Sequence, residues 1–323
     1  MICLGIESTA HTFGIAILDG KRVLSNVYDT YRTEKGGIIP TEAAKHHIKV
    51  KDELILRALN EAKITLNDIG LIAYSKSPGL APCLKQGMLV AKDLHEKLNV
   101  PVIGVNHCIA HLEIGRMLTE AKDPVLLYAS GANTQVIAYA AGKYRVFGET
   151  LDIGVGNFID TFARGAGLGF PGGPKIAELA KKSDHLIELP YSVKGMDVAF
   201  SGLLTNLQQK LKNHTLEELS YSLQETAFAM LIEVSERALA HLGKKELLLG
   251  GGVACNERLQ EMARKMCKER GAKLFCPEKQ FLVDNAAMIA WTGILMHESG
   301  NRTTEIDFDA SERTDDVNVN WRK

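Results

Sequence analysis

The sequence lacks several features that would assign it to a familiar class of protein. Its six cysteines are scattered, and no two form a Cys-x-x-Cys pair, so neither a disulfide framework nor a cysteine-type zinc site is indicated. No apolar stretch approaches the roughly 20 residues that a membrane helix needs, and the N-terminus lacks the basic start of a signal peptide. We therefore expect a soluble protein of the reducing cytoplasm that has no contact with a membrane.

The chain also lacks an excess of positive charge. Its 38 Lys and Arg are balanced by 39 Asp and Glu, which gives a formal net charge of -1. A protein that binds nucleic acid by itself usually carries a basic excess, because affinity depends on the phosphates that it neutralises. Any RNA contact must therefore use a local patch or basic partner subunits. Two basic sets occur, at 45–51 and 264–270, and a solvated helix face is the alternative explanation for each.

What the chain does contain is an internal repeat. A strand pattern at 2–8, a turn of small polar residues and a second strand at 13–18 recur at 125–130 and 135–139. With a shift of 122 positions and no gaps, seven of the fourteen residues from 8 to 21 are identical: Ser8, Ala10, Thr12, Ile15, Ala16, Gly20 and Lys21. Two similar hairpins arising by chance are the alternative, but a duplication is the better interpretation.

Two copies of a strand–turn–strand unit, each followed by helices, predict a two-lobed α/β protein. Helical spacing of apolar residues appears at 86–98 and 221–242. We expect a first lobe at 1–122 and a second lobe at 123–323, with the two turns facing each other across a nucleotide cleft. This arrangement resembles the duplicated fold of the actin, Hsp70 and sugar-kinase superfamily.

A pair of histidines is the first motif with a chemical implication. Asn106 follows a strand-like run at 102–105 and is a good N-cap residue. A helix that begins there places His107 and His111 four residues apart on one face, within reach of a single metal ion. Surface or packing histidines are the alternative for this spacing alone. A zincin peptidase has Glu after the first His, and Cys108 stands there, so that class is not supported.

Two oxygen ligands become plausible once the duplication is accepted. Tyr128 ends the strand that enters the second turn, and Asp284 lies just before an apolar helical segment. Two histidines with oxygen ligands suit iron or zinc better than magnesium. A helix N-cap is the alternative role for Asp284.

Glycine-rich loops are the remaining signal. Gly250, Gly251 and Gly252 separate a buried strand from a helix, and a second glycine loop at 169–175 precedes another helix. Such loops permit close approach of a nucleotide, and a helix N-terminus favours negative charge. Neither loop matches the Walker or the dinucleotide pattern, and each is also explained as purely structural. Asp160 is placed to accept hydrogen bonds from ribose hydroxyls.

Six motifs in order resemble one family over essentially the whole chain. They are Asn-His-x-x-x-His, Tyr-Ala-Ser-Gly-Ala-Asn-Thr, Gly-Asn-Phe-Ile-Asp, Gly-Phe-Pro-Gly-Gly-Pro, Gly-Gly-Gly-Val-Ala-x-Asn and Val-Asp-Asn-Ala-Ala-Met-Ile-Ala. The family is the universal tRNA threonylcarbamoyltransferases, called TsaD in bacteria and the KEOPS catalytic subunit in archaea and eukaryotes. The Cys-Ile-Ala between the two histidines is similar to the archaeal type.

The resemblance implies roles for particular residues. His107, His111 and Asp284 would hold one metal ion, iron or zinc, with Tyr128 able to join them. The substrate or nucleotide would be bound by the turn and the glycine loops, at Tyr128, Ala129, Ser130, Gly131, Ala132, Asn133, Asp160, Gly173, Ala177 and Asn256. One departure concerns position 177, where related sequences often carry Glu and this chain has Ala177, with Glu178 next to it.

The implied reaction moves a threonylcarbamoyl group from threonylcarbamoyl-adenylate to the exocyclic amine of the adenosine next to the anticodon of tRNA, which is t6A modification. The implied partners are tRNA, a KEOPS-type kinase subunit, separate or fused, and small accessory subunits. The sequence names no general base. Two alternatives remain, an ATP-dependent small-molecule kinase of the same superfamily and a non-catalytic ATP-binding scaffold.

Overall fold

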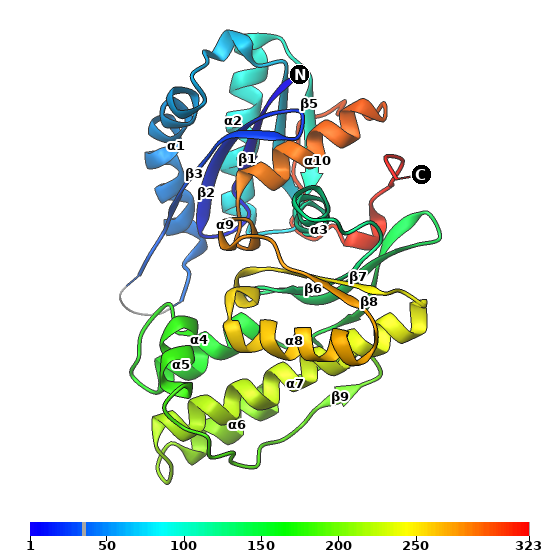
Figure 1. Ribbon diagram of the computed structural model, residues 1–323. Coiled ribbons are helices and arrows are strands. Elements are labelled where there is room, and N and C mark those ends of the chain that lie inside the picture. The colour runs from blue at the N-terminus through cyan, green and yellow to red at the C-terminus, as the bar shows by residue number, and fades with distance from the viewer. Residues whose placement is uncertain (34–36, 323) are drawn as a thin grey trace.

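The computed structural model describes residues 1–33 and 37–322, which form two stacked lobes (Figure 1). A five-stranded sheet forms the centre of each lobe. The first has the order β3 (Arg22–Thr30), β2 (Thr12–Asp19), β1 (Ile2–Glu7), β4 (Leu71–Ser77), β5 (Val102–Asn106). The second has the order β8 (Lys143–Glu149), β7 (Thr134–Ala140), β6 (Val125–Ala129), β11 (Glu246–Gly250), β12 (Lys273–Phe275).

The two sheets share one topology, which confirms the predicted duplication. In each sheet, three antiparallel strands form a meander. A fourth strand pairs in parallel with the first strand of the meander, and a fifth strand pairs in parallel with the fourth. The alignment with a shift of 122 positions is correct for β2 and β7, but it does not hold for the strands that pair with them, β1 and β6. Ile15 pairs with Ile6, whereas Ile137 pairs with Leu126, only 120 positions after Ile6. These paired residues lie nine positions apart in the first hairpin and eleven in the second, so β6 is shifted by two residues relative to β1. The last paired residues enclose six positions in the first turn, 8–13, and four in the second, 130–133.

Helices cover the sheets on their outer faces. In the first lobe α1 (Pro40–Ala62) packs on β2 and β3, and α2 (Ala81–Leu98) packs on β4. The second lobe carries α4 (Val155–Gly165), α5 (Gly173–Ala180), α6 (Ser201–Lys210), α7 (Leu216–Leu242) and α8 (Glu257–Glu269), with a small hairpin of β9 (Val193–Lys194) and β10 (Asp197–Val198). The helices predicted at 86–98 and 221–242 are α2 and α7, and each begins five residues before its predicted start. Pro82 fits the first turn of α2, and Thr215 forms a capping box with Glu218 at the start of α7.

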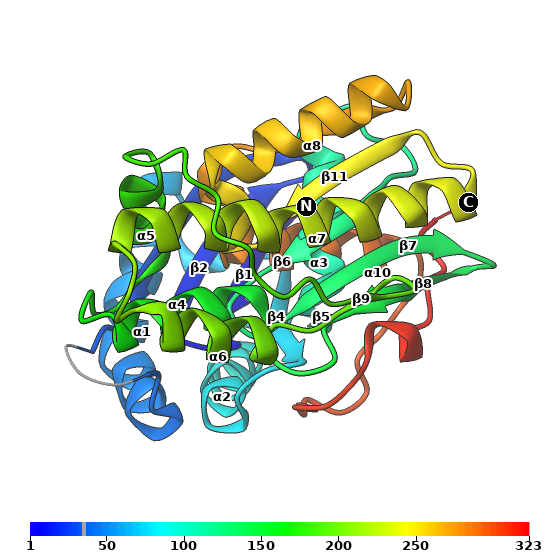
Figure 2. The ribbon, with the colours of Figure 1, turned by 90° about the horizontal axis from the view of Figure 1, so that it is seen from below.

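One helix lies between the two lobes. α3 (His107–Leu118) packs against β4 and β5 of the first sheet and against β6 and β11 of the second (Figures 1 and 2). The approach is close, since a Cβ on Gly115 would lie 2.6 Å from the Leu248 side chain. The strand β5 runs directly into α3, so the first turn of this helix opens at the junction of the lobes.

The end of the chain returns to the first lobe. After α9 (Lys279–Leu282), α10 (Ala286–Glu298) packs on β1, β2 and β4. The following segment accepts hydrogen bonds from both sheets. The Asp307 carbonyl accepts from the Tyr74 hydroxyl, and the Asp315 carboxylate accepts from the Val146 amide. The lobe boundary at residue 122 stays a prediction. It assigned α10 to the second lobe, whereas this helix packs on the sheet of the first lobe. No helix in the described ranges is long and apolar enough to cross a membrane.

Candidate metal and nucleotide site

Two histidines form part of the first turns of α3, as the sequence predicted. Asn106 caps this helix, and its Oδ1 accepts hydrogen bonds from the amides of Cys108 at 3.1 Å and Ile109 at 3.3 Å. One helical turn separates His107 from His111, so the two imidazoles meet edge to face with ring centroids 4.8 Å apart. Both are buried. The spacing was therefore sufficient to place two imidazole nitrogens side by side inside the protein.

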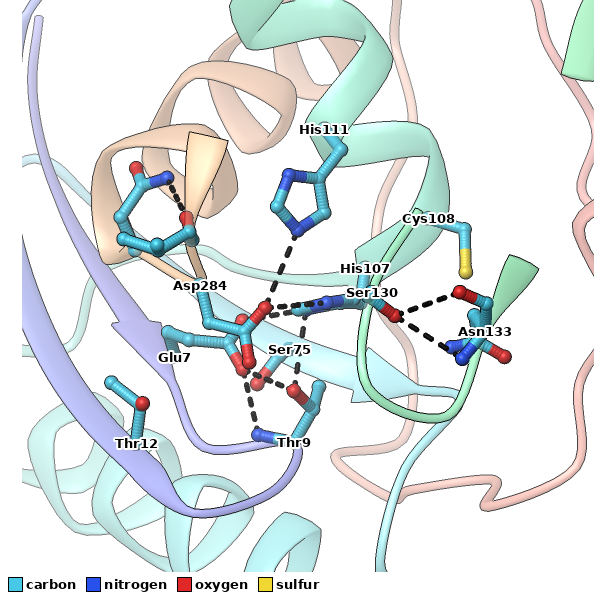
Figure 3. A network of polar contacts seen from close by, with 12 residues as sticks. Glu7, Thr9, Thr12, Ser75, His107, Cys108, His111, Ser130, Asn133 and Asp284 are labelled. Carbon is cyan, nitrogen blue, oxygen red and sulfur yellow. Dashed lines mark hydrogen bonds and ion pairs between the residues drawn. The ribbon is translucent and has the colours of Figure 1, made fainter. Parts of the chain in front are cut away.

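Asp284 brings a carboxylate to this pair from the far end of the chain. Its Oδ1 is 3.3 Å from His107 Nε2 and 3.5 Å from His111 Nε2 (Figure 3). The ligand atoms of the three residues lie within 4.8 Å of one another, as three ligands of one ion do. Asn285, and not Asp284, caps α10, so the helix-cap alternative is wrong. The Tyr128 hydroxyl is 3.0 Å from His107 Nε2.

A buried carboxylate holds the other side of the His107 ring. Glu7 Oε2 lies 3.0 Å from His107 Nδ1, and Glu7 Oε1 accepts hydrogen bonds from the amide of Thr9 at 2.7 Å and from its hydroxyl. A carboxylate on Nδ1 keeps the proton on that nitrogen and leaves the Nε2 lone pair free. Nε2 is the atom that faces Asp284 and Tyr128. Glu7 therefore orients His107 as a ligand.

Charge and hydrogen bonding at the cluster fit a metal ion. Burial lowers the pKa of His111 and keeps it neutral, and neither of its ring nitrogens has a hydrogen-bond partner in the described chain. An unpaired buried polar group costs about 1–3 kcal/mol, and coordination of an ion by Nε2 removes that cost. Burial acts to raise the pKa of Asp284, but His107 and His111 hold it well below its usual value. Burial acts to lower the pKa of His107, but Tyr128, Glu7 and Asp284 raise it well above its usual value. A cation at Nε2, a proton or a metal ion, is therefore favoured beside the ionised Asp284.

The second turn lies beside this cluster and has a different character. The Ser130 amide donates to the Asn133 carbonyl at 2.8 Å, and Ser130 Oγ accepts from the Asn133 amide at 3.1 Å. Gly131 and Ala132 at its tip are exposed. The start of α4 supports the turn so closely that a Cβ on Gly154 would lie 2.3 Å from the Ala132 carbonyl oxygen. The tip therefore offers its backbone to a ligand rather than its side chains.

Comparison with known proteins identifies the family. Residues 22–291 match the family model of the tRNA N6-adenosine threonylcarbamoyltransferase, TsaD. The chain belongs to this family. It is 55% identical over 325 aligned positions to the tRNA N6-adenosine threonylcarbamoyltransferase of Thermococcus kodakarensis, covering 99% of this chain and 100% of that protein. The predicted family and its enzyme class, a transferase that modifies tRNA, are confirmed, and the kinase alternative is not favoured.

Other relatives in the family are longer. A probable bifunctional tRNA threonylcarbamoyladenosine biosynthesis protein of Methanosarcina mazei is 55% identical, and this chain covers only 59% of it. Among solved structures, full-length HypF with phosphate and nucleotide has a TM-score of 0.63 at 10% identity, covering 91% of this chain and 55% of that one. An activator of 2-hydroxyisocaproyl-CoA dehydratase from Clostridium difficile has a TM-score of 0.58 at 11% identity, covering 94% and 100%. These likenesses confirm the predicted fold class.

The substrate residues implied by the family resemblance, apart from Asn256, lie on β6 with the second turn, on α4 and on α5. Residues 128–133 form the end of β6 and the turn itself. Asp160 lies on α4, where its Oδ1 accepts the Gly172 amide at 2.7 Å and burial raises its pKa. Gly173 and Ala177 lie one helical turn apart on α5. A Cβ on Gly173 would meet nothing within 4 Å, so this backbone position borders open space.

Asn256 has a structural role that the sequence analysis did not anticipate. It caps α8, with Oδ1 accepting from the amide of Arg258 at 2.9 Å, and its Nδ2 donates to Gln224 Oε1 at 2.6 Å. Loss of such a cap costs about 0.5–2 kcal/mol of stability. Nucleotide binding by Asn256 stays a prediction, and its substitution tests both roles together.

Sequence reasoning missed Glu7, Thr9 and His11 of the first turn. Glu7 is 100 positions from His107, and its one signal was an acid at the end of an apolar strand. His11 meets Phe170 of the second lobe with ring centroids 6.4 Å apart. No pattern along the chain indicated that contact. The first turn therefore touches both the metal-type cluster and the opposite lobe.

Proposed function

We propose that this chain transfers a threonylcarbamoyl group from threonylcarbamoyl-adenylate to the N6 amine of the adenosine next to the anticodon in tRNA. One observation carries the proposal. The His–His–Asp cluster and the exposed second turn lie on two sides of the same histidine, His107 (Figure 3). A donor with a polar acyl group at one end and a phosphate at the other needs both kinds of site next to each other.

The acyl end of the donor is assigned to the cluster. His107, His111 and Asp284 would hold one ion, and the Tyr128 hydroxyl is in reach of the same place. Two imidazoles with oxygen ligands suit iron or zinc. When bound, such an ion supplies Lewis acidity to a carbonyl oxygen. The residues of the chain provide the rest, because Glu7 fixes the His107 ring and the packing of α3 between the sheets fixes its position.

The adenylate end is assigned to the second turn and α4–α5. Backbone amides at the exposed tip, Gly131 and Ala132, can face a phosphate. Asp160 and the open backbone at Gly173 border the place for the ribose. Attack of N6 on the carbamoyl carbon breaks the bond to phosphate and releases AMP. An adenine amine is a poor nucleophile, so holding both reactants in position should contribute much of the rate.

The same geometry argues against the rival functions. A small-molecule kinase needs the nucleotide loops but has no use for a buried His–His–Asp set beside them. A scaffold that only binds ATP gains nothing from Glu7 orienting His107. For partners, we propose a kinase-like subunit and small accessory subunits of KEOPS type. The word "bifunctional" in the name of the M. mazei relative supports a companion activity. A cytoplasmic location follows from a tRNA substrate.

A calorimetric titration of AMP and of a stable donor analogue, each with and without a chelator, tests the proposal. Chelation should weaken binding of the donor analogue much more than binding of AMP, because only the analogue has an acyl group at the cluster. The Asp160→Asn variant should weaken both ligands alike, by about 1–3 kcal/mol if a buried partner is left unpaired. Equal loss of both ligands on chelation would mean that the ion serves phosphates, and would favour the kinase.

A further inference from the structure

One short segment carries most of the unbalanced positive charge of the chain. Residues 264–279 contain six Lys and Arg and two Glu, a net charge of +4, which leaves -5 for the remaining residues because the total is -1. The other basic set gives no such excess. Residues 40–55 contain three Lys and three acidic residues and are neutral, with histidines counted as uncharged. The first segment therefore stands out from an otherwise slightly acidic protein.

The cations of this segment are exposed and mostly unpaired. We call the basic ridge the five exposed residues Arg264, Lys265, Lys268, Lys273 and Lys279. The salt bridges of the described chain involve none of the five. Arg270 is excluded because it is paired with Glu236 at 2.9 Å. Unpaired cationic side chains attract a polyanion such as RNA, because each phosphate that they neutralise releases a bound counterion, and this release favours binding.

The ridge extends from α8 through β12 to the first residue of α9, a short helix that contacts α3. α8 lies on the outer surface (Figures 1 and 2). Arg264 and Lys268 line a hollow of about 490 Å³ between α8 and β12. Arg264 is eight residues and Lys268 twelve residues after Asn256 on the helix, so they are about 12 and 18 Å along its axis. Lys279 begins α9, five residues before Asp284.

The chemistry of the ridge favours a nucleic-acid backbone over an acidic protein. Protein interfaces usually combine charge with buried aromatic or aliphatic anchors. The exposed large apolar side chains of the described chain all lie outside residues 264–279. Long flexible cations without an apolar anchor contact phosphates without reading sequence. We propose that the basic ridge binds the phosphate backbone of the RNA substrate and leads the target adenosine toward Asp284. This proposal rests on the proposed function for the identity of the RNA.

The test compares a triple ridge variant with a matched control. Arg264→Gln, Lys268→Gln and Lys273→Gln are combined in one protein, and Lys21→Gln, Lys194→Gln and Lys212→Gln, which are also exposed and outside the salt bridges, in the other. Binding of an unmodified tRNA transcript to the full chain is measured by fluorescence anisotropy, starting at low ionic strength. The slope of log K against log salt should fall by about 2–3 in the ridge variant, at about 0.7–0.9 per lost phosphate contact, and should change little in the control.

Activity gives a second readout. The ridge variant should raise the KM for tRNA at least about tenfold, while kcat and the affinity for the donor analogue stay unchanged. Equal salt slopes in the wild-type protein and the ridge variant would overturn the proposal, as would failure of the wild-type chain to bind tRNA at low salt. Competition by polyglutamate that exceeds competition by RNA would assign the ridge to an acidic protein instead. Failure of transfer with intact tRNA binding would overturn the proposed reaction and leave the ridge standing.

Discussion

The two turns of the duplicated fold began with the same sequence pattern and have opposite surroundings. The first turn is closed and polar inside. Ser8 and Thr9 are buried, and Gly87 lies so near that a Cβ there would be 2.1 Å from Ser8 Oγ. The second turn is exposed at Gly131 and Ala132. In the first turn side chains make the contacts, whereas in the second the backbone does. There the carbonyls of Ser130 and Gly131 accept hydrogen bonds from the amides of Gly156 and Asn157 at 3.0 and 2.9 Å.

The difference shows how one unit can provide two chemistries beside one histidine, His107. In the longer first turn, 8–13, Thr9 donates hydrogen bonds to Glu7, and Glu7 contacts His107. The tighter second turn bonds mainly to itself, through Ser130 and Asn133. We infer that the first copy has specialised in orienting a metal ligand, and the second in approaching an anionic group. Four predictions separate these two roles.

The largest effect is expected from His107→Ala. This variant removes the ligand that the first turn orients, so it should lose most of its metal and all detectable transfer. The second turn is untouched, and binding of AMP should stay near the wild-type level. Metal analysis of the purified protein and a calorimetric AMP titration check both halves. Full metal content in the variant would contradict the assignment of the cluster.

Glu7→Gln tests the first turn without removing a ligand. The amide keeps the size of the side chain but no longer provides a carboxylate for His107 Nδ1. Loss of such a carboxylate typically costs 10–100-fold in metal affinity or activity. Ser130→Ala is the matched change in the second turn and should leave metal affinity unchanged. If competition with a chelating dye gives the two variants the same affinity, the division of roles between the turns is wrong.

Gly154→Ala probes the support of the second turn. The new Cβ would lie 2.3 Å from the Ala132 carbonyl oxygen, and backbone atoms must shift. Such overpacking typically costs about 1–3 kcal/mol of stability, and AMP affinity should fall with it. Gly131→Ala is the control, because its nearest contact is 3.6 Å away, and its unfolding free energy should change by less than about 0.5 kcal/mol. Denaturant unfolding of both variants measures these changes. Equal losses of unfolding free energy in the two variants would show that close packing at Gly154 is not the cause.

The smallest effect concerns pH and the first turn. His47 on α1 donates to the Ala10 carbonyl, and burial, with His46 and His11 nearby, lowers its pKa from 6.5 to about 4. The unfolded chain therefore takes up this proton first. Stability from this group is complete above pH 6.5, falls as the pH drops toward about 4, and falls no further below that.

At pH 5.5 the expected loss is about 1.4 kcal/mol of unfolding free energy relative to pH 8, from one pKa unit at about 1.36 kcal/mol. The measurement is urea unfolding at both pH values. His47→Gln should make the difference between pH 8 and pH 5.5 smaller by that amount, although the variant is less stable throughout. An unchanged difference would show that His47 is not the group that titrates.

Local patterns predicted the site better than they predicted its support. Asn106, His107 and His111 belong to one helix start, whose cap and spacing are legible within six residues. Motif order implied Asp284. The role of Glu7 was not predicted, because a hydrogen bond between residues 100 positions apart leaves no periodic pattern in the sequence. The shifted register of the first turn escaped as well, since a gap-free match compares spacing along the chain and not pairing between strands. Asn256 was assigned one role where the structure gives it a second.

The packing of α10 on the first sheet has a consequence for how the protein is made. A Cβ on Gly5 of β1 would lie 2.4 Å from the Ala286 carbonyl oxygen, so helix and strand meet backbone to backbone. Residue 286 leaves the ribosome 281 residues after residue 5, which takes roughly 15–60 s at about 5–20 residues per second. During that time the apolar inner face of β1, β2 and β4 has no native cover. The lobe that is synthesised first therefore cannot fold to completion until the last part of the chain has been made, and a nascent chain that stalls before residue 286 exposes an apolar surface to chaperones and to its neighbours.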